Sequence, residues 1–244
     1  MKKPGSHISE PVKILLWVYG VGVAGMLLPF SRDLFIRITP LNLLFAAAFL
    51  FFGKKPHRRV WITGTGIFIV SFLVEAVGVN TGKIFGEYVY GHTLGPKLLN
   101  TPVIIGLNWF VLIYCTNIIG RKFWEVVAGG GSNRVTSAYG QKSVILSAGG
   151  RSFIQSIFVV VTGSLLMVAY DLLLERAAIR LDMWTWSGDG IPFRNYAAWF
   201  LFSLLFHIAV RLWGEDEANE RALPLFAVQM VFFALIVGFY ASVL

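Results

Sequence analysis

The residues best suited to chemistry lie between Glu75 and Trp109, where polar and aromatic side chains separate two strongly apolar runs. This stretch contains amide, hydroxyl, carboxyl and imidazole groups, namely Asn80, Thr81, Glu87, Tyr88, Tyr90 and His92. Polar groups flanked by hydrocarbon-like sequence are costly to hold in a membrane and are usually functional. We therefore expect this stretch to form part of a functional site.

A second stretch of similar character runs from Glu175 to Asn195. It contains Trp184 and Trp186 on either side of a threonine, followed by a Gly-Ile-Pro turn. Carboxyl groups can deliver or accept protons, and the faces of aromatic rings stabilise cations. The two stretches together therefore favour acid–base chemistry beside an apolar pocket.

The composition places both stretches in a membrane protein. The chain has 244 residues, of which 56% are hydrophobic and only 14% charged, and its mean hydropathy is +0.69. Its net charge of +8 comes from basic residues in short loops between apolar runs, which is a topology signal and not a nucleic-acid site. Cys115, the single cysteine, lies in an apolar run and is expected to be a small buried hydrophobe. The sequence has no zinc-ligand spacing, phosphate-binding loop or Gly-x-Ser-x-Gly motif.

A spanning helix needs about 20 apolar residues. This length predicts an all-α, polytopic bundle of about seven transmembrane helices in a single domain over 1–244, with the first helix retained and not cleaved as a signal peptide. The expected helices lie near residues 11–30, 34–52, 60–79, 102–120, 153–174, 196–213 and 222–243. Arg37, Pro40 and Asn42 interrupt the second of them.

The distribution of charge predicts the orientation of the bundle. With the N-terminus in the cytoplasm, roughly two thirds of the 21 lysines and arginines face inwards, as the positive-inside rule requires. The Gly-rich segment 121–152 is then a flexible cytoplasmic connection, whereas loops 80–101 and 175–195 share the outer face. We therefore expect these two loops to meet near the outer leaflet.

Three polar side chains are expected in one layer beneath these loops. At a rise of 1.5 Å per residue, Glu75 lies about 7 Å and Asn108 about 9 Å below the outer ends of their helices, and Asp171 lies within about one turn of its own. Burial in hydrocarbon favours a protonated carboxyl, which is suited to deliver a proton. The alternative is structural, with Asp171 or Glu75 paired with Arg176 or Arg180.

The aromatic side chains have two interpretations. Rings near the outer ends of the helices can line a pocket and stabilise a cation. They can also form the aromatic belt found at membrane–water interfaces. The residues concerned are Tyr88, Tyr90, Trp109, Trp184 and Trp186.

The two stretches together resemble a known family, the CruF-type carotenoid 1,2-hydratases, which include bisanhydrobacterioruberin hydratases. The first block that carries the resemblance consists of Glu75, Asn80-Thr81-Gly82, Phe85-Gly86-Glu87-Tyr88, Tyr90, Leu94-Gly95-Pro96-Lys97, Pro102 and Ile105-Gly106-Leu107-Asn108-Trp109. The second consists of Asp171, Glu175, Trp184-Thr185-Trp186, Gly190-Ile191-Pro192, Asn195 and Trp199. Arg176 departs from the pattern, since the family has a proline after this glutamate, where its helix breaks.

The resemblance implies an integral membrane hydro-lyase that adds water across the terminal C1=C2 double bond of an acyclic carotenoid and leaves a tertiary 1-hydroxyl. It implies no metal and no redox cofactor, and the partners are the carotenoid and membrane lipid, with no nucleic acid and no defined oligomeric state. The expected catalytic residues are Asp171, Glu75, Glu87, Asn108 and Glu175. The expected substrate-binding residues are Asn80, Thr81, Phe85, Tyr88, Tyr90, Trp109, Trp184, Trp186, Asn195 and Trp199.

The mechanism expected from this resemblance begins with a carboxylic acid, Asp171 or Glu75, that protonates C2. Aromatic rings stabilise the tertiary cation at C1, and a water held by Asn108, Asn80 or Glu87 attacks it. The polyene would lie in an apolar groove between helices. Two alternatives remain open: an integral lycopene-cyclase-like enzyme, and a non-catalytic carotenoid- or lipid-binding membrane protein, such as a transporter.

Overall fold

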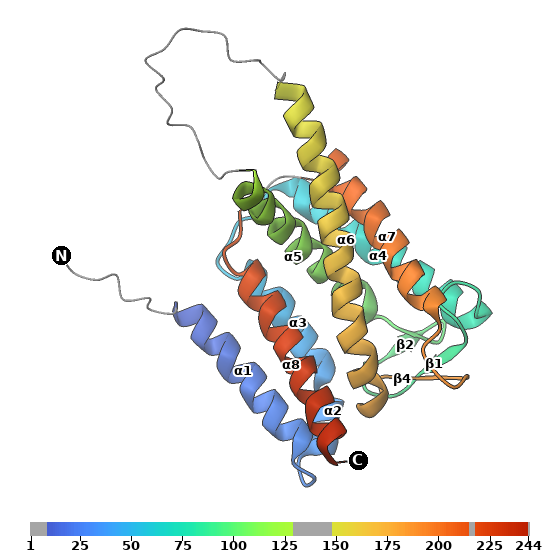
Figure 1. The fold of residues 1–244 in the computed structure, drawn as a ribbon. Coiled ribbons are helices and arrows are strands. Elements are labelled where there is room, and N and C mark those ends of the chain that lie inside the picture. Colours follow the sequence, from blue (N-terminus) through green and yellow to red (C-terminus); the bar gives the residue numbers. More distant parts are fainter. Residues whose placement is uncertain (1–8, 129–147, 215–217, 244) are drawn as a thin grey trace, which may run out of the picture.

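The computed structural model describes residues 9–128, 148–214 and 218–243, which form an all-helical bundle with four very short strands (Figure 1). Six of the helices are long and apolar enough to cross a membrane, which confirms the prediction of a polytopic membrane protein. The expected connection at 121–152 lies largely outside the described residues. The helices are α1 (Glu10–Leu27), α2 (Arg32–Arg37), α3 (Thr39–Phe51), α4 (Arg58–Thr81), α5 (Ile104–Val127), α6 (Ala148–Arg180), α7 (Phe193–Trp213) and α8 (Ala222–Val243).

The second crossing differs from the single helix predicted over 34–52. It consists of α2 and α3, which are separated at Ile38, so the prediction of one continuous helix was wrong. Pro40 stands in the first turn of α3, where a proline is tolerated because the backbone N–H of that position has no partner within the helix. At 13 residues, α3 is about 20 Å long and too short to span the bilayer core alone.

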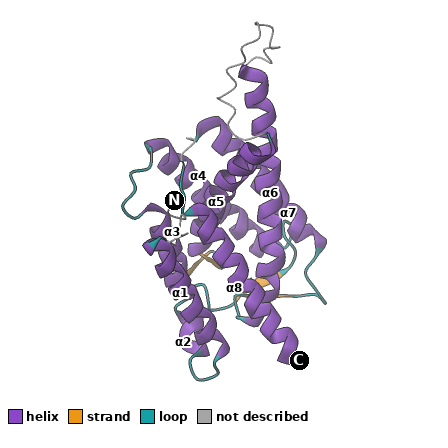
Figure 2. Ribbon diagram, turned by 60° about the vertical axis from the view of Figure 1, so that its left-hand side comes forward, coloured by secondary structure: helices purple, strands orange, loops and turns teal. Residues whose placement is uncertain are grey.

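Successive crossings alternate in direction, with α2 and α3 together returning the chain between α1 and α4 (Figures 1 and 2). Contacts at both ends of the bundle fix this arrangement. At one end Arg221 donates hydrogen bonds to the carbonyl oxygens of Phe49 and Phe52. At the other, Arg32 donates to the carbonyl of Arg180.

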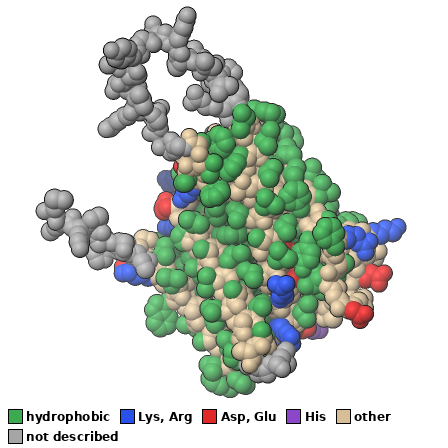
Figure 3. Space-filling view, viewed as in Figure 1, with side chains coloured by type: hydrophobic (Ala, Val, Ile, Leu, Met, Phe, Trp, Pro, Cys, Tyr) green, Lys and Arg blue, Asp and Glu red, His purple; other side chains and the backbone are tan. Residues whose placement is uncertain are grey.

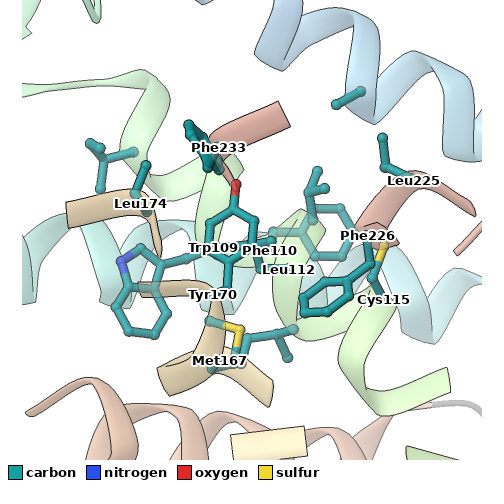
Figure 4. Packing of buried hydrophobic residues seen from close by; sticks show 14 of the residues in the cluster. Trp109, Phe110, Leu112, Cys115, Met167, Tyr170, Leu174, Leu225, Phe226 and Phe233 are labelled. Carbon is teal, nitrogen blue, oxygen red and sulfur yellow. The ribbon is translucent and has the colours of Figure 1, made fainter. Parts of the chain in front are cut away.

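Helix α5 lies at the centre and is the most buried of the candidate spans. Gly106 allows α4 to approach it, because a Cβ at this position would lie 2.5 Å from the carbonyl oxygen of Phe68. Small residues at such crossings are typical of membrane helices. Cys115 of α5 lies in the apolar core of the bundle, as expected for a buried hydrophobe (Figure 4).

The outer surface of the bundle is apolar. Hydrophobic side chains cover most of the face drawn in Figure 3. Large hydrophobic residues such as Trp17, Phe30 and Leu41 are exposed. A soluble protein rarely exposes so large a contiguous apolar area. This surface is suited to contact with lipid tails.

The two polar loops meet, as predicted, and a pair of short strands joins them. Strand β1 (Tyr88–Tyr90) pairs antiparallel with β4 (Trp184–Trp186), with Tyr88 opposite Trp186 and Tyr90 opposite Trp184. A second, smaller hairpin is formed by β2 (Lys97–Leu98) and β3 (Thr101–Pro102). Helix α6 continues past Glu175 to Arg180 without a break, so the chain has no helix break where Arg176 replaces the family's proline.

Candidate active site

A cavity of about 70 Å³ lies beneath the β1–β4 pair, among the helix ends that adjoin these strands. One water molecule needs roughly 10–15 Å³ of such space, so the cavity can hold several waters or a small apolar group. Eleven of the fifteen residues predicted for the site line it: Glu75, Phe85, Tyr88, Tyr90, Asn108, Trp109, Glu175, Trp184, Trp186, Asn195 and Trp199.

Glu75 is held in this cavity by three donors. Its Oε2 accepts hydrogen bonds from the hydroxyls of Tyr88 at 2.7 Å and Tyr90 at 2.9 Å. Its Oε1 accepts from the indole nitrogen of Trp109 at 3.1 Å. Burial and the neighbouring carboxylate raise the pKa of both tyrosines well above its usual value of 10, so their hydroxyls stay neutral and available as donors.

Glu175 is held by three different donors. The indole nitrogens of Trp184 and Trp186 both donate to its Oε2, at 2.9 and 2.8 Å. The side-chain amide of Asn195 donates to its Oε1 at 3.1 Å. Because an indole N–H can only donate, Glu175 Oε2 is fixed as an acceptor.

Asp171 lies close to Glu175 but does not line the cavity. Its Oδ2 accepts from the same Asn195 amide at 2.7 Å, while its buried Oδ1 has no partner among the described residues. Asn195 therefore bridges two carboxyl groups, and only that of Glu175 faces the cavity. The structure does not bring Asp171 to the position expected of a direct proton donor.

The aromatic rings form the walls of the cavity. Trp109 stacks on Trp199 with ring centroids 4.4 Å apart, and Tyr88 packs against Trp186 at 5.0 Å. Trp109 is only 1% exposed, and Tyr88, Tyr90 and Trp184 are also buried. These rings are thus pocket residues, and the interpretation as an interfacial belt does not describe them.

Sequence comparison identifies the family. A family model described as "Carotenoid biosynthesis protein" matches residues 38–244, which include the whole cavity apart from the part formed by α1. The chain belongs to this family. The match confirms the resemblance drawn from the two motif blocks.

A curated relative gives further detail. The chain is 27% identical over 170 residues to a bisanhydrobacterioruberin hydratase of Haloarcula japonica, covering 67% of the chain and 48% of that protein. The chain thus spans about half the length of the curated relative that it matches. No solved structure was found to match it.

The structural alternative for the carboxylates of this family member is not supported. The described residues contain only two ion pairs, Lys13 with Glu10 and Lys54 with Glu220, and both lie away from the cavity. Arg180 instead lies over the ring of Tyr240 at 5.9 Å. The carboxyl groups of the site are therefore held by hydrogen bonds from neutral donors and not by arginine.

Besides Asp171, three predicted site residues lie outside the cavity. Glu87 is exposed because it precedes Tyr88 in the strand, and successive side chains of a strand point to opposite faces. Asn80 supports the β2–β3 hairpin, since its amide donates to the carbonyl of Leu99 at 2.9 Å. Thr81 donates to the carbonyl of Val77 within α4. The structure thus gives Asn80 and Thr81 local structural roles.

Five further residues with polar groups line the cavity but were not predicted: Tyr19, Thr39, Asn42, Tyr170 and Gln229. They come from α1, α3, α6 and α8. The Gln229 amide donates to the Tyr19 hydroxyl at 3.0 Å, and the buried Oε1 of Gln229 has no partner among the described residues. Asn42 and Gln229 are each a lone polar residue inside an apolar run, and this pattern could have indicated that they face a polar site.

Within the described residues, no group of three or more His, Cys, Asp or Glu side chains is arranged to hold a metal ion. The chemistry available to the cavity from this chain is that of two carboxyl groups, amides, phenols and indoles.

Proposed function

We propose that this protein is a carotenoid hydratase that adds water to the terminal double bond of an acyclic carotenoid. The observation that carries the proposal is the pairing of two buried glutamates, Glu75 and Glu175, in one aromatic cavity of a carotenoid biosynthesis protein. The similarity to a hydratase of Haloarcula japonica supports the same reaction.

The acid in this proposal is Glu75, because its partners permit a change of protonation. A tyrosine hydroxyl can donate or accept, so a protonated Glu75 Oε2 can donate to Tyr88 or Tyr90, and the ionised form can accept from both. The proton can reach C2 of the substrate from Glu75 itself or through a tyrosine hydroxyl. Asp171, the other acid expected from the sequence, has no direct access to the cavity.

Glu175 acts as the permanent carboxylate. Its Oε2 accepts from two indoles and its Oε1 accepts from the Asn195 amide, and because these groups only donate, they favour the ionised form of Glu175. A fixed negative charge in a water-poor cavity strongly stabilises a developing cation. The stacked faces of Trp109 and Trp199 add to this stabilisation at C1.

Water completes the reaction. Asn108 lines the cavity and its side chain makes no hydrogen bond to another described residue, so it is free to orient a water molecule. As the oxygen of this water bonds to C1, one of its protons passes to the ionised Glu75, directly or through other waters in the cavity, and this restores the acid. The sum is one water added, with a new C–H bond at C2 and a C–O bond at C1.

The proposal also includes an orientation. Basic residues concentrate at the N-terminal end of α1 and in the connections on that side, which favours a cytoplasmic N-terminus. The β1–β4 pair lies at the opposite end of the bundle (Figure 1). The cavity would then lie near the outer leaflet.

Glu75→Gln and Glu175→Gln, expressed separately in a host that makes acyclic carotenoids, test the proposal. We expect hydrated pigment to fall by about 10²–10⁴-fold in each, the usual contribution of acid–base groups. Glu125→Gln, an exposed change at the far end of α5, is the matched control. Pigment that gains no mass of water with the unmodified protein would contradict the proposal: an isomer of unchanged mass would indicate a cyclase, and unchanged bound pigment a binding protein.

A further inference from the structure

A second apolar space opens beside the cavity, between α1 and the broken α2–α3 crossing. Its volume is about 230 Å³, larger than that of the cavity. Its walls are almost entirely apolar and include Val18 and Gly22 of α1, Phe35 of α2, and Leu41 and Phe45 of α3. We call this space the α1–α3 groove.

The groove adjoins the cavity along a shared wall. Five residues line both: Tyr19, Met26, Thr39, Asn42 and Phe232. The polar members of this set stand where the two spaces meet, and the rest of the groove is hydrocarbon. An occupant of both spaces would therefore have an apolar body in the groove and a reactive end among the polar groups.

The groove opens towards lipid at the break between α2 and α3. Ile38, at the break, is 37% exposed, and Leu41 is 62% exposed. Helix α2 has no buried residue, although the Phe35 ring packs closely on Gly25 of α1. A hydrocarbon chain can enter here from the bilayer without crossing a polar surface.

Size decides what occupies the groove. A cavity of about 70 Å³ accepts only the end group of a carotenoid, so the long polyene must lie elsewhere. We infer that the α1–α3 groove holds the polyene of the substrate and admits its end from the bilayer into the cavity. This inference rests on the proposed function for the identity of the occupant.

Gly22 provides the sharpest test. A Cβ at this position would lie 3.5 Å from the Phe232 ring, an ordinary contact, so the atoms of a larger side chain would fill the groove without a backbone clash. Gly20, on the same helix, has open space around it and is exposed. Gly22→Leu therefore blocks the groove, and Gly20→Leu is its matched control.

Leu41 and Leu44 of α3 give an independent pair of test and control positions. Both are exposed residues of α3, but only Leu41 lines the groove. Leu41→Trp narrows the mouth, whereas Leu44→Trp adds the same ring to the lipid-facing surface. Since neither site is buried, both variants should fold.

Retention of pigment on the purified protein is measured in a Glu75→Gln background, and hydrated product in the unmodified background. We expect both to fall at least about tenfold with Gly22→Leu and with Leu41→Trp, because the added side chain occupies the space of the polyene; tenfold corresponds to about 1.4 kcal/mol of binding free energy. Neither should change with Gly20→Leu or Leu44→Trp. Unchanged elution and melting temperature establish that each variant is folded.

Three results would overturn the assignment of the groove to the polyene. They are full retention of pigment by both groove variants, an equal loss of pigment in the control variants, and a Glu75→Gln protein that retains no pigment. Bound phospholipid displaced by Gly22→Leu, with pigment retained, would assign the groove to lipid instead. If the unmodified protein binds pigment but yields no hydrated product, the proposed function fails, and pigment retention still tests the groove.

Discussion

Asn195 offers the most informative single substitution, because one amide group serves two carboxyls. Its Nδ2 lies 2.7 Å from Asp171 Oδ2 and 3.1 Å from Glu175 Oε1, and the residue is 2% exposed. Hydrogen bonds to charged groups contribute about 1.5–3 kcal/mol each. Asn195→Ala removes both donors and leaves buried carboxyl oxygens without partners, so we expect a loss of at least about 3 kcal/mol of unfolding free energy.

The assay is reversible unfolding of the purified protein in mixed micelles, combined with pigment analysis. Asn195→Ala combined with Asp171→Asn should lose less stability than the sum of the two single changes, because the neutral amide lowers the cost of the unpaired site. Wild-type stability in Asn195→Ala, or strict additivity in the double variant, would refute the bridge between the two carboxyls.

Three other predictions concern neighbouring features. Trp109→Phe keeps the aromatic face but removes the donor to Glu75, and we expect a decrease of about tenfold in hydrated pigment, as the loss of one hydrogen bond predicts; normal product would contradict a role for this bond. Gly106→Val forces a side chain against the Phe68 carbonyl and should lower the unfolding free energy by about 1–3 kcal/mol, measured in the same micelles; a gain would disprove the close approach. The pKa of Tyr90 is well above 10 in the folded protein, whereas a tyrosine of the unfolded chain ionises near 10. The free energy of unfolding should therefore decline as pH rises above 10, and Tyr90→Phe should make this decline shallower. Equal slopes in the two proteins would contradict this prediction.

Hydropathy predicted most of the fold, because six of the crossings are long apolar helices with independent length signals. It failed at 34–52, where an apolar average concealed the break at Ile38. Arg37 and Pro40 were visible in the sequence as interruptions, but whether an interruption bends or divides a helix depends on the neighbours that satisfy the freed backbone groups.

The candidate site was predictable to the extent that its residues cluster along the chain. Glu75, Asn108 and Glu175 reach one cavity because helix ends and loops place them in one layer. The rotation of α6 about its axis was not predictable, and it is this rotation, together with the position of Asn195, that places Asp171 behind the wall. Gln229 was missed because its contribution depends on how α8 packs in the bundle.

The pairing of β1 with β4 relates the two halves of the site by an approximate two-fold symmetry. Its register is centred on Val89 and Thr185, so a two-fold rotation about that pair carries Tyr88 onto the position of Trp184 and Tyr90 onto that of Trp186. The same order of parts occurs on each side: a helix with a glutamate, a strand with two aromatic donors to it, and a helix that begins with an asparagine and a tryptophan. The two series are α4 with Glu75, β1 and α5 with Asn108 and Trp109, and α6 with Glu175, β4 and α7 with Asn195 and Trp199.

This arrangement is a local pseudo-two-fold symmetry whose two halves differ in their donors. In the proposed mechanism, the phenols of one half allow its glutamate to gain and lose a proton, while the indoles of the other half, which can only donate, favour the charged form of theirs. The chemical asymmetry that the mechanism needs would thus come from the difference between tyrosine and tryptophan within a symmetric framework.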